Sequence, residues 1–328
     1  MITFLRRRDV ERLLDMPTCI GAVEQAFRTR ASGGRATSAL LGLPTKGGGF
    51  HVKAALIELN STSYFAAKIN ANFPANPRDR GLPTIQGVLA LFDAVSGCPL
   101  ALMDSIAITT LRTAAATAVA ARYLAPAEAE SLLLVGCGNQ ARAHLTALLA
   151  VRPVARVFAY DVDSAIAAGF ATEMCELHQL SVSAVSDLHA AALSSEMIVT
   201  CTPATKAFLE VEDVQQGAFV AAVGADNEHK HEISSALMAA ACVVVDDLEQ
   251  CAAIGDLHHA IKDGAMRQDH VRAELGDVVC DPASGRRAST EIVVFDSTGV
   301  AIEDVAAAAT VYERAVAEGG GQEISLLD

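Results

Sequence analysis

After Pro126 the sequence alternates between short apolar runs and longer amphipathic stretches. Helices are predicted for residues 140–150 and 164–178. Strands are predicted for the apolar runs at residues 131–135, 156–160, 197–200, 219–223, 242–245 and 291–295. Strands that alternate with helices form a parallel sheet with helices on both faces. The sequence therefore predicts an α/β fold that contains a Rossmann-type sheet.

A Gly-x-Gly turn joins the first predicted strand to its helix. Gly136 and Gly138 follow the run Leu132–Val135, and Ala141 stands where a third glycine is common. Main-chain N–H groups at such a helix start can bind a pyrophosphate. A bare Gly-x-Gly is more often an ordinary turn. The strand, turn and helix order around it predicts a dinucleotide site.

Asp161 ends the second predicted strand. It lies near the offset of about 20 residues at which an acid binds ribose hydroxyls in this fold. Asp161 could instead cap the next helix, although Asp163 is better placed for that role. No Lys or Arg follows directly, so a 2′-phosphate would meet two carboxylates and no cation. We therefore predict NAD as the cofactor, with NADH favoured over NADPH.

The segments outside this alternation have a different texture. Residues 9–32 show helical spacing of apolar positions, and residues 39–103 hold short apolar runs split by Gly, Pro and Asn. Ala-rich helices are predicted from Ile108 to Leu124 and from Ile302 to about Ala317. The first part therefore reads as a helical opening followed by a mainly antiparallel sheet.

Two domains are expected from the length of 328 residues and from this change of texture. Pro126 is the predicted hinge, and we expect the last helix to return to the first domain. The prediction is an α+β substrate-binding and dimerisation domain of residues 1–125 and 301–328, with a Rossmann NAD-binding domain of residues 126–300.

Composition argues against several classes of partner. A net charge of -14 would repel nucleic acid, and charged residues interrupt each apolar stretch before it could span a bilayer. The N-terminal sequence lacks the pattern of a signal peptide. The eight cysteines and the pair His258-His259 lack metal-site spacing, so we predict reduced thiols, no metal, and loop positions for both histidines. We expect a cytoplasmic protein.

Three charged side chains are candidate site residues. Arg112 is predicted near a helix N-terminus, where a cation opposes the helix dipole unless an anion is nearby; it binds either a carboxylate or a surface acid. Lys68 interrupts an apolar strand, so it faces a site or reaches solvent at an edge. Asp226 follows the run 219–223, and it either caps a turn or exchanges a proton beside a nicotinamide.

Together these segments resemble the ornithine cyclodeaminase and mu-crystallin family over nearly the whole chain. The resemblance is carried by five ordered blocks, each weak by itself. They are Lys68 with Asn72-Phe73-Pro74 and Leu82-Pro83-Thr84; Met103-Asp104 through Leu111-Arg112-Thr113-Ala114-Ala115; Gly136-x-Gly138-x-Gln140-Ala141; Val223-Gly224-Ala225-Asp226 with Lys230; and Phe295-Asp296-Ser297-Thr298-Gly299 with Glu303-Asp304.

The resemblance implies a homodimer and assigns roles to residues. Lys68, Arg112 and Arg35 would bind a substrate carboxylate, and Lys68 could also orient a water. Asp226 would be the acid/base residue, so the predicted catalytic pair is Asp226 and Lys68. The predicted cofactor-binding residues are Thr84, Thr113, Gly136, Gly138, Asn139, Gln140, Asp161, Thr202, Val223, Lys230 and Ser297.

The substrate is less constrained. An ornithine-specific member should carry an acid before Lys68 to hold the distal ammonium, but this chain has His51 and Lys53 there. Either residue could be structural. If both face the pocket, they favour a substrate that is uncharged beyond its carboxylate, such as 1-pyrroline-2-carboxylate or 1-piperideine-2-carboxylate, or one with a second anion, such as iminosuccinate.

The resulting prediction is an NAD(P)H-dependent reductase that converts 2-imino acids to L-amino acids, with Asp226 as the proton donor. The alternatives are an ornithine cyclodeaminase, an alanine dehydrogenase or iminosuccinate reductase, and a ligand-binding protein without catalysis on the same scaffold.

Overall fold

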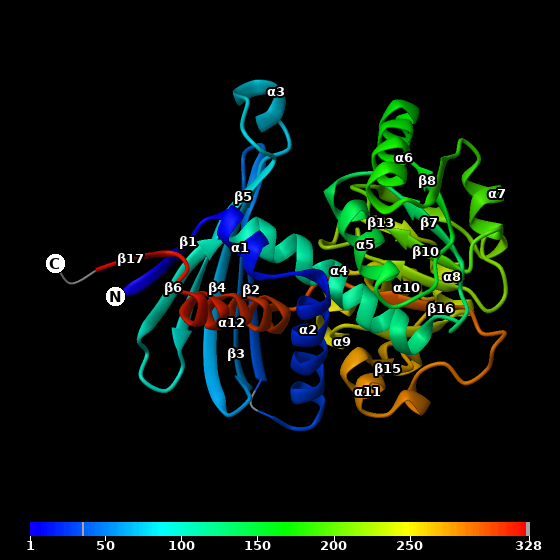
Figure 1. Ribbon diagram of the computed structural model, residues 1–328. Coiled ribbons are helices and arrows are strands. Elements are labelled where there is room, and N and C mark those ends of the chain that lie inside the picture. The colour runs from blue at the N-terminus through cyan, green and yellow to red at the C-terminus, as the bar shows by residue number, and fades with distance from the viewer. Residues whose placement is uncertain (35, 326–328) are drawn as a thin grey trace. The chain divides into compact units, whose positions relative to one another are not determined.

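The computed structural model describes residues 1–34 and 36–325, and it divides into two compact units (Figure 1). The first unit comprises Met1–Ala116 and Val300–Asp328, and the second comprises Thr117–Gly299. The division after Ala116 falls inside helix α4 (Ser105–Leu124), whereas the hinge predicted from the sequence was Pro126.

The first unit contains a seven-stranded sheet with the order β17-β1-β6-β5-β4-β3-β2. Neighbouring strands are antiparallel except for β1 and β6, which are parallel. The strands are β1 (Ile2–Leu5), β2 (Ala36–Thr45), β3 (Gly48–Leu59), β4 (Thr62–Asn72), β5 (Ile85–Asp93), β6 (Pro99–Asp104) and β17 (Gln322–Ile324). The predicted antiparallel runs lie within β3, β4 and β5.

One face of this sheet forms a core with helices. Alternate residues of the central strands, such as Ile57, Ala66 and Leu89, are buried on that face. The helices of this unit are α1 (Arg7–Leu13), α2 (Met16–Ala31), α3 (Asn76–Arg80), the first part of α4, and α12 (Ala301–Glu318). α12 packs against α2, β3 and β4, so the two ends of the chain share one core.

The predicted helical region 9–32 is two helices rather than one. The carboxylate of Asp15 accepts a hydrogen bond of 2.8 Å from the main-chain nitrogen of Thr18, and this caps α2. Pro17 lies in the first turn of α2, where no main-chain donor is needed. Inside one continuous helix its missing N–H would break a hydrogen bond, so the chain starts a new helix here.

The opposite face of the sheet carries solvent-exposed apolar side chains. The strand pairing places on this open face Leu41, Leu43, Phe50, Ile69, Val88 and Leu102, each at least 36% exposed. A contiguous apolar surface of this kind is typical of an interface rather than of a free monomer surface.

Helix α4 begins earlier than predicted, at Ser105. Asp104 caps it: one carboxylate oxygen accepts hydrogen bonds from the main-chain nitrogens of Ile106 at 3.1 Å and Ala107 at 2.9 Å. Arg112 therefore lies two turns inside the helix, and the prediction that it stands at the N-terminus was wrong. Its position cannot be explained by the helix dipole.

The second unit contains an eight-stranded sheet in which every neighbouring pair is parallel, with the order β15-β14-β16-β12-β10-β7-β8-β9. A separate two-stranded sheet pairs β11 with β13. The strands are β7 (Ser131–Val135), β8 (Arg156–Tyr160), β9 (Ser181–Ala184), β10 (Met197–Thr200), β11 (Thr205–Leu209), β12 (Phe219–Ala222), β13 (His231–Ile233), β14 (Cys242–Val245), β15 (Ala273–Glu274) and β16 (Val293–Asp296).

The predicted parallel sheet is present, and β7, β8, β10 and β14 have the predicted bounds. Every residue of β7, β10, β12, β14 and β16 is buried, which explains their continuous apolar sequences. The helices of this unit are α5 (Asn139–Leu149), α6 (Ser164–His178), α7 (Leu188–Leu193), α8 (Ser235–Ala240), α9 (Leu248–Ile254), α10 (Asp256–Lys262) and α11 (Leu275–Cys280).

Candidate functional site

The glycine turn after β7 leaves its main chain open at the start of α5. Gly136 has a φ of +90°, and a Cβ there would lie 2.9 Å from Cγ2 of Thr202. Gly138 caps α5, and a Cβ at that position would meet nothing within 4 Å. The turn therefore needs glycine at 136 for its own geometry, whereas glycine at 138 keeps clear the space in front of a helix N-terminus.

Asp161 lies beside this turn, at the end of β8. Its two carboxylate oxygens accept hydrogen bonds from the main-chain nitrogens of Cys137 at 2.9 Å and Asp163 at 3.0 Å. Asp163, as predicted, caps α6 by accepting a hydrogen bond of 2.9 Å from Ala165. Burial raises the pKa of the Cys137 thiol to about 12, so this cysteine is a packed thiol rather than a thiolate nucleophile.

A cavity of about 270 Å³ opens next to Asp161. Its walls are mainly apolar, and they come from the ends of β7 and β8 and from the segment after β10. The lining residues are Val135, Gly136, Tyr160, Asp161, Val162, Leu188, Thr202, Pro203, Ala204 and Phe208. An apolar cavity with a carboxylate at its edge suits an adenine base and a ribose.

Gln140 also fits a dinucleotide at this turn. It lies in the first turn of α5, and its side-chain oxygen is buried without a hydrogen-bond partner among the residues that the structure describes. An amide oxygen is an acceptor, so this atom calls for a hydrogen-bond donor from a ligand or a water, and a pyrophosphate offers none. With the clear space at Gly138, the donor groups of the turn are compatible with a bound pyrophosphate.

The loop after β12 carries Asp226 and ends at Lys230. The Asp226 side chain is exposed, and its Oδ1 lies 2.7 Å from Nζ of Lys230. Asn227 donates a hydrogen bond of 3.1 Å to the same oxygen. The ammonium of Lys230, predicted to line the cofactor, is thus held by the carboxylate predicted to exchange the proton. Val223, at the start of this loop, is buried.

Ser297, the last residue of the predicted cofactor set, follows β16 and is buried. Its hydroxyl donates a hydrogen bond of 3.1 Å to Asp246, and Asp246 also accepts one of 2.6 Å from the main-chain nitrogen of Gly299. The side chain of Ser297 therefore helps to hold its own loop in place through Asp246.

In the first unit, Lys68 on β4 and Arg112 on α4 meet at two acids of α12. Nζ of Lys68 and Nε of Arg112 both lie 2.8 Å from Oδ1 of Asp304. Arg112 also donates a hydrogen bond of 2.8 Å to Glu303, and Lys68 one of 3.1 Å to Thr109. All four charged side chains are at most 5% exposed. This arrangement is a buried cluster of cations held by two carboxylates.

The cluster perturbs the ionisation of its members. Burial lowers the pKa of Lys68 to about 7, and the positive charge of Arg112 acts in the same direction against the attraction of Asp304. Burial alone would raise the pKa of Asp304, but the charges of Arg112 and Lys68 hold it below its usual value. Oδ2 of Asp304 is buried without a hydrogen-bond partner among the described residues.

Strand register brings His51 and Lys53 to the same face as Lys68. Lys53 pairs directly with Lys68 across β3 and β4, and His51 pairs with Asn70. The charge of Lys53 lowers the pKa of both Lys68 and Asp304, so it lies within electrostatic range of the cluster. Three cations, Lys53, Lys68 and Arg112, are therefore close enough to influence one another.

The remaining predicted residues of this unit have smaller structural signatures. Thr84 precedes β5, and its main-chain oxygen accepts a hydrogen bond of 2.8 Å from Phe73. Thr113 is buried in α4 directly after Arg112. Arg35, predicted to bind the carboxylate, lies outside the described residues.

The two adjacent histidines lie in a helix, so their predicted loop position was wrong. His258 and His259 belong to α10. Gly255 separates this helix from α9 and is its N-cap residue. His259 bonds to the main-chain oxygen of Lys230 at 2.8 Å and stacks on His231 with 4.0 Å between ring centroids. Within residues 1–34 and 36–325, no group of three His, Cys, Asp or Glu side chains could hold a metal ion.

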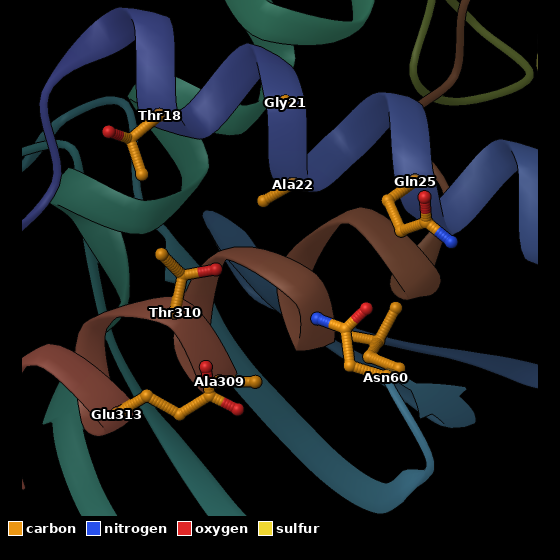
Figure 2. A pocket seen from close by; sticks show the side chains of 9 residues that line it. Thr18, Gly21, Ala22, Gln25, Asn60, Ala309, Thr310 and Glu313 are labelled. Carbon is orange, nitrogen blue, oxygen red and sulfur yellow. The ribbon is translucent and has the colours of Figure 1, made fainter.

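A second cavity, of about 320 Å³, lies in the first unit between α2 and α12 (Figure 2). Thr310 and Glu313 of α12 face Ala22 and Gln25 of α2 across it, with Asn60 at one end. None of the described residues predicted for the site lines this cavity.

A profile described as the ornithine cyclodeaminase/mu-crystallin family matches residues 2–319. The chain belongs to this family. The family assignment and the α/β fold drawn from the sequence are thereby confirmed.

The relatives of this chain include an alanine dehydrogenase and reductases of Delta(1)-pyrroline-2-carboxylate. The alanine dehydrogenase of Archaeoglobus fulgidus is 36% identical over 320 residues, which cover 98% of this chain and 97% of the relative. A solved archaeal alanine dehydrogenase dimer with bound NAD is 35% identical, with a TM-score of 0.93 and 99% of both chains covered. The Delta(1)-pyrroline-2-carboxylate reductase of Thermococcus litoralis, solved with NADH and L-proline, is 29% identical, with a TM-score of 0.93 over 98% of this chain and 100% of that one.

No role was predicted from the sequence for three buried acids that bind other site residues: Glu303 and Asp304 in the first unit and Glu232 in the second. The resemblance included Glu303 and Asp304 without a role; their signal is two acids at the start of an otherwise apolar, buried helix. Glu232 is buried on β13 of the two-stranded sheet and has no comparable local signal, because a single acid in a short segment of polar and apolar residues is common. No helix among the described residues of this chain is long and apolar enough to cross a membrane.

Proposed function

We propose that this family member is an NADH-dependent reductase of 2-imino acids, with 1-pyrroline-2-carboxylate or 1-piperideine-2-carboxylate as the substrate. The observation that carries the proposal is the buried pair of cations Lys68 and Arg112, fixed by Asp304 and Glu303. Rigid cations of this kind hold a carboxylate in one orientation, which a reaction at the adjacent α carbon requires.

The second unit supplies the cofactor site. The main-chain N–H groups of the Gly136 turn bind the pyrophosphate, Gln140 lies beside it at the start of α5, and Asp161 binds the ribose hydroxyls beside the 270 Å³ cavity. A carboxylate at Asp161 repels a 2′-phosphate, and the next residue, Val162, offers it no cation. When bound, NADH supplies a hydride to the α carbon of the imino acid and leaves as NAD⁺.

Asp226 supplies the proton that the substrate nitrogen gains as its C=N bond becomes a CH–NH bond. A protonated imine accepts a hydride more readily than a neutral one. The acid therefore protonates the nitrogen before the hydride transfer or together with it. Lys230, 2.7 Å from Asp226, fixes the carboxylate and stabilises it once its proton has gone.

The charges near Lys68 disfavour a diamine. His51 and Lys53 share the face of β3 and β4 with Lys68, and no acid occupies their positions. The ammonium at the far end of ornithine would meet the ammonium of Lys53 rather than a carboxylate at these positions. This observation supports reduction of a cyclic imino acid over cyclodeamination.

A second candidate function is that of an alanine dehydrogenase, which interconverts alanine with pyruvate and ammonia. It is favoured by the 36% identity to the Archaeoglobus fulgidus alanine dehydrogenase. Both activities need the same bound carboxylate and the same acid, and they differ in the size of the imino acid accepted. A comparison of kcat/KM between substrates therefore separates the two activities better than the identity of the site residues does.

The test is NADH oxidation followed at 340 nm with purified protein and four substrates offered separately: 1-pyrroline-2-carboxylate, 1-piperideine-2-carboxylate, pyruvate with ammonia, and iminosuccinate. We expect the highest kcat/KM for a cyclic imino acid, and a loss of at least about 100-fold in kcat for Asp226→Asn. Ammonia release from ornithine with catalytic NAD, or unchanged turnover by Asp226→Asn, would contradict the proposal.

We also propose that the open apolar face of the sheet in the first unit packs against a second copy of the chain. Its residues Phe50, Ile69 and Val88 are exposed in one copy, and a relative of the same length is a dimer in its solved structure. Covering such a face removes apolar surface from water.

A further inference from the structure

Glu232 is a buried acid that the proposed chemistry does not use directly. It is the middle residue of β13 and is fully buried. Oε1 accepts hydrogen bonds from the main-chain nitrogen and the hydroxyl of Thr202, and Oε2 accepts from the hydroxyl of Thr200 and the main-chain nitrogen of Gly224. All four distances are 2.7 Å.

These bonds connect the carboxyl ends of two neighbouring strands. Thr200 ends β10 and pairs with Ala222 at the end of β12, so Thr202 and Gly224 lie on the segments that leave the sheet side by side. Ligands of parallel sheets bind at these carboxyl ends. Glu232 thus holds together the two segments on which the proposed cofactor residue Thr202 and the proposed acid Asp226 are placed.

The position of Glu232 is itself fixed from behind. Oδ1 of Asp256 accepts hydrogen bonds from the main-chain nitrogens of Glu232 at 2.8 Å and Ile233 at 3.0 Å. A Cβ at Gly224 would overlap the Glu232 carboxylate, so glycine at this position leaves the room that the carboxylate occupies. The Glu232 carboxylate is therefore enclosed by its neighbours, which hold it in one orientation.

We propose that Glu232 is a positioning residue, whose carboxylate sets the spacing of the β10 and β12 loops so that Thr202 meets the cofactor and Asp226 meets the substrate. This rests on the proposed function, because Thr202 and Asp226 take their roles from it. The proposal assigns Glu232 no contact with either ligand.

An amide cannot replace the carboxylate at this position. Each oxygen of Glu232 receives one main-chain N–H, from Thr202 on one side and from Gly224 on the other. In Glu232→Gln the NH2 group must face one of these two donors, whichever way the amide is turned. We call the four hydrogen bonds to the Glu232 carboxylate the clamp. In Glu232→Gln one loop loses its main-chain bond to the clamp although the side chain keeps its size.

Two variants control for effects on folding. Glu196 also binds main-chain groups at the edge of this sheet, but at the amino end of β10, where a single oxygen accepts from Glu130 and Ser131. Glu196→Gln can keep these bonds through its one oxygen. Val199→Ala makes a cavity inside β10 and lowers stability without touching the clamp.

The experiment measures the Kd for NADH by nucleotide fluorescence, and kcat and KM with the preferred imino acid, at a temperature well below unfolding. Thermal unfolding of each variant gives its Tm separately. For Glu232→Gln we expect at least a tenfold weaker NADH affinity and at least a tenfold lower kcat. Glu196→Gln and Val199→Ala should stay within about twofold of the parent in both, whatever their Tm. A Glu232→Gln protein that loses Tm but keeps NADH affinity and kcat within twofold would overturn the proposal.

Thr200→Val provides a milder variant if Glu232→Gln does not fold. It removes one of the four donors and keeps the shape of a buried residue. We expect it to weaken NADH binding by about threefold, and an unchanged NADH affinity would contradict the clamp. NADH binding does not depend on the substrate, so a parent protein that turns over no imino acid refutes the proposed function while the NADH measurements still decide the role of Glu232.

Discussion

Lys68 and Asp304 form a buried ion pair, with 2.8 Å between Nζ and Oδ1, and the two side chains are 3% and 2% exposed. The same Asp304 oxygen accepts a hydrogen bond from Arg112. One carboxylate oxygen therefore holds two cations that would otherwise repel each other. The proposed carboxylate site depends on this shared anion.

Substrate binding should weaken as pH rises through about 7. Burial, reinforced by the charge of Arg112, lowers the pKa of Lys68 to about 7, so its ammonium is present below that pH and lost above it. A bound carboxylate favours the charged form, and binding at pH 8 should take up a proton. We expect KM for the imino acid to rise between pH 6 and 9, and calorimetry in two buffers to detect the proton uptake.

Lys68→Arg is the matched variant for this pH dependence, since a guanidinium stays charged over the whole range. Its KM should vary less with pH than that of the parent. A parent KM that is constant from pH 6 to 9 would show that Lys68 does not titrate as its surroundings indicate.

Asp304→Asn should be strongly destabilising. The change leaves Lys68 and Arg112 buried with one carboxylate, Glu303, instead of two, and breaking a buried pair in this way costs about 3 to 5 kcal/mol. Urea unfolding measures the free energy. Glu313→Gln, on the exposed side of the same helix where it accepts a hydrogen bond from Tyr64, is the control and should cost about 1 kcal/mol. Equal stabilities of the two variants would be evidence against a common anion for the two cations.

The two glycines of the β7 turn should respond differently to alanine. Gly136→Ala forces a Cβ onto a φ of +90° and within 2.9 Å of Thr202, so it should lower stability by about 1 to 3 kcal/mol. Gly138→Ala meets no protein atom within 4 Å and should keep its stability. Its Cβ enters the space in front of α5, so NADH affinity should fall at least tenfold. Fluorescence titration and thermal unfolding of both variants test this, and a Gly138→Ala protein with normal NADH affinity would exclude the pyrophosphate from that space.

Cofactor preference should be reversible at Asp161. The double change Asp161→Ser with Val162→Arg removes a carboxylate and adds a cation at a residue that is 95% exposed. We expect the ratio of kcat/KM for NADPH to that for NADH to rise at least tenfold, with Val162→Arg alone as the control for the added charge. If the parent already prefers NADPH, Asp161 does not select the cofactor.

The open sheet face should decide the assembly. Ile69→Lys puts a charge into the centre of the exposed apolar surface, whereas Leu177→Lys puts one on α6, where Leu177 is 65% exposed. Sedimentation equilibrium should give a dimer for the parent and for Leu177→Lys, and a monomer or weak dimer for Ile69→Lys. A monomeric parent at micromolar concentration would refute the proposed interface.

Local sequence patterns were sufficient for much of the second unit. The strands β7, β8, β10 and β14 could be placed because each is an apolar run between turn residues, and the turn at Gly136 follows from a glycine spacing with its own backbone geometry. Asp163 could be identified as a helix cap for the same reason. In each case the decisive interactions join residues close in sequence.

The predictions from local patterns were wrong for two helices, and for different reasons. Arg112 was predicted to lie near a helix N-terminus. It lies two turns inside α4, because Asp104 caps this helix and it begins at Ser105. His258 and His259 have little helix signal of their own, yet they lie in α10 and one stacks on His231. The cap at Asp104 is a local signal that the sequence analysis overlooked, whereas the stacking of His259 on His231 depends on the fold.

The glycine turn, the acid Asp161 and the family were determined by the sequence, since each depends on a fixed order of residues along the chain. The tertiary structure decided what surrounds Lys68: its partner Asp304 lies 236 positions away on α12, and Arg112 reaches Glu303 across 191 positions. Glu232 likewise joins strands that are separate in sequence. Buried charges need partners of opposite charge or several hydrogen bonds, and only folding determines which distant residues supply them.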